Sequence, residues 1–85
     1  MALISVSDGF AKKSFTSVEN KFITKYMPVL DPVAVKVYLF ALYILNNGLT
    51  SYTLEDLATR LSITSDDAKN YFEYLEEFEL VSIVS

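Results

Sequence analysis

A chain of 85 residues with a net charge of −4 makes a single domain and has few cations with which to hold duplex DNA. It has no cysteine for disulfides and no histidine, the commonest general base, so thiolate and zinc sites are excluded and catalysis is disfavoured. The longest apolar run, residues 37–45, is far shorter than the ~20 residues of a bilayer span, and residues 1–7 lack a signal-peptide pattern. A cytoplasmic, non-enzymatic domain without cofactor or metal is expected.

Two elements are expected before residue 30. Residues 2–6 alternate in polarity and are typical of a strand. Thr16 and Glu19 have the spacing of an N-terminal capping box, which predicts a helix over residues 17–26. Pro28 ends that helix, because the residue before a proline is pushed out of the helical region.

The next helix is expected from Asp31 to about residue 46. Asp31 can accept a hydrogen bond from a free amide, Pro32 needs no amide partner at the helix start, and Gly48 suits the C-terminal cap. Apolar side chains cover nearly the whole circumference of this helix. Either the domain alone encloses it, or one flank packs on the domain and another on a second subunit. Under the second interpretation, the self-association interface contains Val35, Tyr38, Leu39 and Leu42.

A pair of helices joined by a tight turn follows, over residues 54–61 and 65–78. Each begins with a threonine and an aspartate at capping-box spacing, Thr53 with Asp56 and Thr64 with Asp67. In a helix-turn-helix, the early exposed residues of the second helix meet base edges in the major groove. Here that surface is acidic and would repel phosphates, so we expect it to contact protein partners. The partner-contact residues are Asp66, Asn70, Glu73 and Glu77.

Branched, alternating residues at 80–84 predict a strand, with a short partner strand near Tyr52. A helix-turn-helix closed by a small sheet is the winged-helix plan. The predicted fold is therefore mostly α with a small β-sheet, a winged helix-turn-helix. It forms a single domain over residues 1–85 with its core at about residues 15–84. The end of the chain directly after the last strand favours an N-terminal fragment of a longer protein.

Two groups of charged residues allow more than one interpretation. The neighbouring carboxylates at 66–67 and 76–77 are interpreted as a solvated face, because adjacent helix residues point in different directions and hold a cation poorly. The lysines near the first helix are either solvated surface or weak DNA contacts. DNA contacts would suit the alternative function, a winged-helix transcriptional regulator; a phage or plasmid adaptor that blocks a host protein stays open as a third class. These lysines are Lys12, Lys13, Lys21 and Lys25.

Four sequence blocks stand out for their order along the chain: FTSVENKFI at 15–23, YMP at 26–28, VKVYL at 35–39 and YFEYLEEFELV at 71–81. Together they resemble the N-terminal domain of DnaD-like replication initiation proteins. The resemblance covers about residues 15–84, and VKVYL is its best single match. The chain departs from the family at residues 30–34, where a glycine-containing turn is expected, and at Phe72 and Glu79, where a tryptophan and a glycine are expected.

The resemblance implies a primosomal or phage replisome-organiser protein of Gram-positive type. In such proteins the N-terminal domain mainly self-associates and contacts other initiation proteins, while a separate C-terminal domain carries most DNA binding. We therefore expect a non-catalytic oligomerisation and protein–protein interaction domain that forms a dimer or tetramer. DNA contact is expected to be weak, or indirect through a C-terminal domain that this chain lacks.

Overall fold

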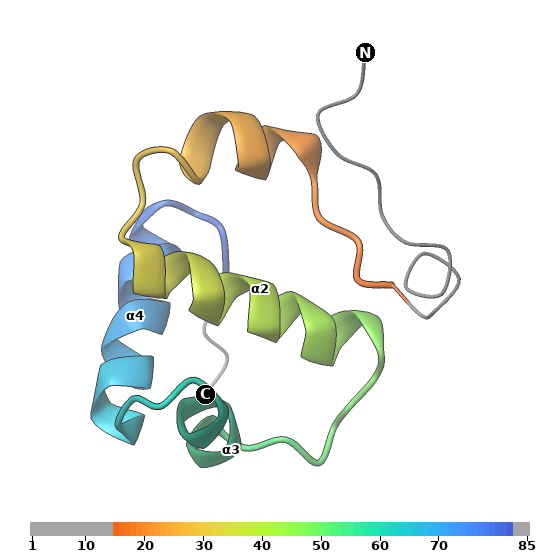
Figure 1. The fold of residues 1–85 in the computed structure, drawn as a ribbon, viewed down its shortest axis with the longest axis vertical. Coiled ribbons are helices and arrows are strands. Elements are labelled where there is room, and N and C mark those ends of the chain that lie inside the picture. Colours follow the sequence, from red (N-terminus) through yellow and green to blue (C-terminus); the bar gives the residue numbers. More distant parts are fainter. Residues whose placement is uncertain (1–14, 83–85) are drawn as a thin grey trace.

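The structure, a computed structural model, describes residues 15–82. Within this range four helical elements follow one another: η1 (Phe22–Tyr26), α2 (Pro32–Asn46), α3 (Leu54–Arg60) and α4 (Ser65–Glu77). In Figure 1, α2 crosses the middle of the molecule, with η1 on one side of it and α3 on the other. α4 packs against both α2 and α3 and so joins them into one body.

The starts of the three α-helices confirm the predicted caps. The Asp31 carboxylate accepts from the Val33 amide at 2.9 Å, and Pro32 occupies the first turn of α2. The Thr53 hydroxyl and the Asp56 carboxylate exchange reciprocal bonds with each other's backbone amides, which completes a capping box before α3. The hydroxyl of Thr64 accepts from the Asp67 amide at 3.0 Å and begins α4. At each start a local side chain therefore satisfies one of the amides that lack a partner within the helix.

The three α-helices also end in the same way. After each helix one residue takes the left-handed conformation: Gly48 (φ 61°), Ser62 (φ 59°) and Glu79 (φ 61°). In each case the next residue's amide donates back to a carbonyl five residues earlier, the pattern of a Schellman motif. The residues that make this bond are all apolar and partly buried, as the motif favours: Leu49, Ile63 and Leu80.

The first helical segment differs from the predicted helix over residues 17–26. Helical backbone begins at residue 20, and the Phe22 amide bonds to the Glu19 carbonyl at 3.1 Å. No side chain caps the start of η1, so the expected Thr16–Glu19 capping box does not form there. The Met27 amide donates to the Phe22 carbonyl at 2.8 Å, a bond across five residues that widens the turn into a π-helix.

The predicted small β-sheet, and the winged-helix fold that depends on it, is wrong. Residues 15–82 contain no strand, and the structure is a globule of three or four helices. Tyr52 lies in irregular backbone, and residues 80–82 form no ladder. The reason is the end of α4, because the Leu80 amide is bonded to the Leu75 carbonyl at 3.2 Å and the Leu80 side chain packs against the core. The expected strand at residues 2–6, and residues 83–84 of the last one, lie outside the described residues.

The core lies where α2, α3 and α4 meet, and Phe22 of η1 reaches into it. The Phe22 ring stacks on the Tyr38 ring with centroids 4.3 Å apart. This contact and Leu30 attach the segment before α2 to the rest of the molecule. The buried side chains are Phe22, Leu30, Ala34, Val37, Tyr38, Leu57, Ala58, Ala68 and Leu75.

Candidate protein-binding groove

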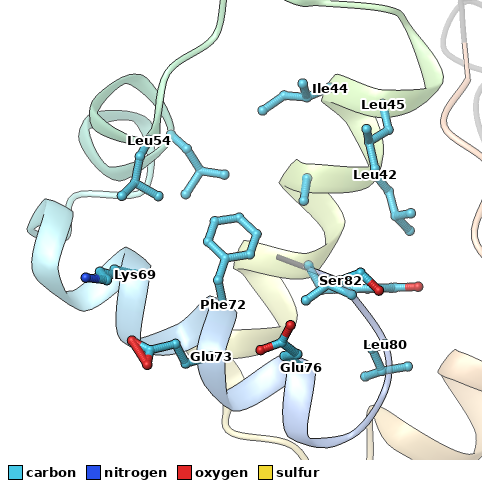
Figure 2. A pocket seen from close by; sticks show the side chains of 14 residues that line it. Leu42, Ile44, Leu45, Leu54, Lys69, Phe72, Glu73, Glu76, Leu80 and Ser82 are labelled. Atoms are coloured by element: carbon cyan, nitrogen blue, oxygen red, sulfur yellow. The ribbon is translucent and has the colours of Figure 1, made fainter. Parts of the chain in front are cut away.

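An open groove of about 890 Å³ lies between the C-terminal half of α2, the helices α3 and α4, and the chain that follows α4 (Figure 2). Its volume falls in the range of sites that hold a small molecule or a few side chains of a partner. No sequence pattern predicts this groove, because segments that are separate in the chain form its walls.

The walls of the groove are apolar. From α2 come Tyr38, Ala41, Leu42 and Leu45, at the i, i+3, i+4, i+7 spacing that places side chains on one face of a helix. Phe72 rises from α4 into the space between α2 and α3 (Figure 2). Leu45, at the C-terminal end of this apolar face, is 75% exposed. A partner that covered Leu45 would remove apolar surface from water, which favours binding.

The polar edge of the groove belongs to α4. Lys69, Glu73 and Glu76 line this side, and Figure 2 shows them together along the helix. The chain after α4 closes the other side with Leu80, Val81 and Ser82. The groove therefore combines an apolar floor with a mainly acidic edge.

α2 also faces a second, shallower hollow of about 500 Å³, on a different face. There the rings of Phe40, Tyr43 and Tyr52 meet edge to face, with centroids 5.5 to 6.4 Å apart. Lys36 and Arg60 lie at the margin, and Leu39 is 38% exposed beside them. The second hollow explains why α2 is apolar nearly all round: one face enters the core, one lines the groove, and one carries this aromatic cluster.

The four residues predicted for self-association do not share one surface. Tyr38 is 8% exposed and stacked on Phe22, so its ring mainly serves packing within the chain. Val35 is half-buried and packs against the core. Leu42 lines the groove, whereas Leu39 lines the second hollow. Packing within residues 15–82 leaves part of α2 uncovered.

The predicted acidic surface of α4 forms a continuous exposed stripe. Its members recur at i, i+4, i+7, i+11 and all are exposed. Within the part of the chain that the structure describes, none of them makes an ion pair. The stripe runs beside the groove, which shares Glu73 with it. The members are Asp66, Asn70, Glu73 and Glu77.

The predicted basic edge is only partly described. Lys21 and Lys25 are exposed, one just before η1 and one within it, while Lys12 and Lys13 lie outside the described residues. Sequence reasoning missed the apolar side chains among them. Ile23 and Met27 are four residues apart, and both are substantially exposed.

Tyrosines of α4 hold the start of α2. The Asp31 amide donates to the Tyr74 hydroxyl at 3.3 Å. Partial burial raises the pKa of Tyr71. The negative charge of Asp31, whose carboxylate also accepts a hydrogen bond from the Tyr71 hydroxyl, raises it further, as does the charge of Asp67. Burial likewise raises the pKa of Tyr38, with a smaller contribution from the charge of Glu19. Of these three tyrosines, Tyr38 also lines the groove. Tyr71 and Tyr74 do not line it and serve to hold the start of α2.

Searches of the chain against protein-family models, curated proteins and solved structures find no match. Residues 15–82 hold no group of three or more acidic, histidine or cysteine side chains placed to bind a metal ion. No helix in the same range is long and apolar enough to cross a membrane. The features that remain for function are the groove, the acidic stripe and the exposed first segment.

Proposed function

We propose that this chain is a non-catalytic module that self-associates and binds other proteins through the apolar groove. The observation that carries the proposal is the exposed Leu45, set in an apolar face whose other members line the same groove. Fully burying a leucine contributes about 1.5–3 kcal/mol, and aromatic side chains such as Phe72 are frequent in protein interfaces.

The cellular role that we propose is assembly of a replication-initiation complex, with this chain as part of a DnaD-like protein. The blocks FTSVENKFI and VKVYL support this role. The acidic stripe supports it from physical chemistry, because its carboxylates would repel DNA phosphates and favour cationic protein surfaces. DNA contact by this chain is then weak, or indirect through another domain.

We place the proposed self-association surface in the groove. Leu42 and Leu45 lie in the groove, while Leu39 belongs to the second hollow on another face of α2. We therefore propose that the groove is the self-association surface, and Leu39 serves as the control position for Leu42 and Leu45. It has the same side chain on the same helix, at a partly exposed position.

The test is sedimentation velocity of the unmodified chain and of Leu45→Glu, Leu42→Glu and Leu39→Glu. A carboxylate in the groove should abolish self-association, because its desolvation is costly next to an acidic edge. Leu39→Glu adds the same charge outside the groove and should leave association intact. Urea unfolding of each variant separates lost association from lost stability. Equal behaviour of Leu45→Glu and Leu39→Glu would refute the proposal.

A further inference from the structure

The segment 20–29 forms an exposed ridge, which we call the η1 ridge. Its apolar members are Ile23, 44% exposed, together with Met27 and Val29, which is 69% exposed. Lys21 and Lys25 are exposed on the same segment. Of the residues in this ridge, Phe22 alone is fully buried, and its ring fixes the ridge to Tyr38. The ridge is thus held in place at its base while its outer side chains lack cover from the rest of residues 15–82.

The η1 ridge and the groove are complementary in chemistry. The ridge offers exposed apolar side chains on one flank and two cations on the other, and the groove offers an apolar floor beside an acidic edge. Lys69 is one cation at that edge, but Glu73 and Glu76 accompany it, and Glu77 continues the stripe beyond them. Opposite charges around an apolar contact steer association and exclude other partners.

The ridge does not fill the groove of its own copy. None of residues 20–29 is among the side chains that line the groove. In Figure 1 the gold and orange helical segment stands on the side of α2 away from α3, whose Leu54 forms part of the groove wall. The stacked rings of Phe22 and Tyr38 hold the ridge there. A ridge that enters a groove must then belong to another molecule.

We infer that the groove receives the η1 ridge of a second copy of this chain. Ile23 and Met27 enter the apolar floor, and the positive charge of Lys21 and Lys25, on the opposite flank of the segment, is attracted to the acidic edge that carries Glu73 and Glu77. The two surfaces are different parts of the chain, so the contact is head to tail. Each copy still presents a free ridge or groove, and assembly continues until a ring closes or a filament grows. This inference rests on the proposed function and names the occupant of the groove.

Charge reversal in the full 85-residue chain tests the inference. One variant carries Lys21→Glu with Lys25→Glu, and the other carries Glu73→Lys with Glu77→Lys. All four positions are exposed, so the fold should tolerate the changes. Each variant alone should lose self-association in sedimentation velocity, because like charges then face each other. An equimolar mixture should regain it, since each reversed surface now meets its opposite on the other variant.

The control variant carries Lys36→Glu with Arg60→Glu, in the second hollow. It changes the net charge by as much as the ridge variant, so it reports general repulsion between acidic molecules. It should associate as the unmodified chain does. With one variant labelled uniformly with ¹⁵N to separate the two masses, native mass spectrometry of the mixture should show complexes that contain both variants.

Three outcomes separate the two proposals. If each charge-reversed variant loses self-association and the mixture regains it, the head-to-tail contact is supported. Association that persists in both reversed variants but is lost in Leu45→Glu overturns the η1 ridge as occupant and leaves the groove as a binding surface. A monomeric unmodified chain overturns self-association and the ridge together.

Discussion

At the scale of single residues, the ends of the helices carry the clearest local strain. A side chain with a Cβ atom in the left-handed region costs roughly 1–2 kcal/mol, which glycine avoids. Gly48 adopts the left-handed conformation without this cost, whereas Ser62 and Glu79 adopt nearly the same φ although they carry a Cβ atom. Glu79 is also a position at which the DnaD-like pattern has a glycine. The departure from that pattern thus falls on a position where the backbone favours glycine.

Replacing Glu79 by glycine should therefore stabilise the fold. We expect Glu79→Gly to raise the free energy of unfolding by up to ~1 kcal/mol, the strain relieved less the backbone entropy that glycine adds. Gly48→Ala is the reverse control: its new Cβ would meet no atom within 4 Å, so a loss of about 1 kcal/mol would isolate the backbone term. Urea unfolding measures both. A destabilised Glu79→Gly would show that the Glu79 side chain contributes more than its strain costs.

The raised pKa of Tyr71 predicts how the free energy of unfolding changes at alkaline pH. Its pKa is raised in the folded chain, so folding favours the protonated hydroxyl. This contribution is fully present below the unfolded pKa of about 10 and is lost as the pH rises through the folded pKa. In Tyr71→Phe the fall in unfolding free energy between about pH 8 and about pH 11 should be smaller than in the unmodified chain. Urea titrations at both pH values check this, with Tyr52→Phe as a tyrosine remote from Asp31; an unchanged pH dependence in Tyr71→Phe would contradict it.

At the scale of elements, the starts of the α-helices were predictable and η1 was not. Capping signals such as Thr53 with Asp56 act over three residues, so the sequence itself contains the whole interaction. The π-type turn of η1 places Phe22 on Tyr38, sixteen positions further along the chain, and no local pattern encodes that contact. The strand predicted from residue 80 failed for a related reason. Leu80 and Val81 alternate as strand residues do, but the Leu80 amide is bonded in the Schellman motif and both side chains pack against the core.

The attachment of η1 through one ring has a measurable consequence. Phe22→Ala should lower the free energy of unfolding by about 3–5 kcal/mol, as for other buried phenylalanines, because it leaves a cavity beside Tyr38. Ile23→Ala removes an exposed neighbour on the same element and should cost much less. Urea unfolding at low protein concentration, where the chain is not associated, compares the two. Equal losses would mean that the Phe22–Tyr38 stack does not hold η1.

At the scale of the whole molecule, residues 15–82 leave large apolar side chains outside their core. Within this range nine side chains are buried, while large apolar groups such as Leu45 and Val29 stay in contact with water. Small domains bury a smaller fraction of their surface and often gain stability from a partner. The near-complete apolar circumference of α2 was visible in the sequence, but it left open whether the domain alone or a second subunit covers the helix. The groove itself was not predictable, because its floor depends on how Phe72 and Leu54 meet α2 in space.

The central claim is that the groove makes this chain self-associate. Sedimentation equilibrium of the unmodified chain tests it most directly, by the weight-average mass from low to high micromolar concentration. We predict a mass that rises with concentration above the 9.6 kDa of one chain, and a Leu45→Glu variant that stays at that value throughout. A constant 9.6 kDa for the unmodified chain up to high micromolar concentration would contradict the claim.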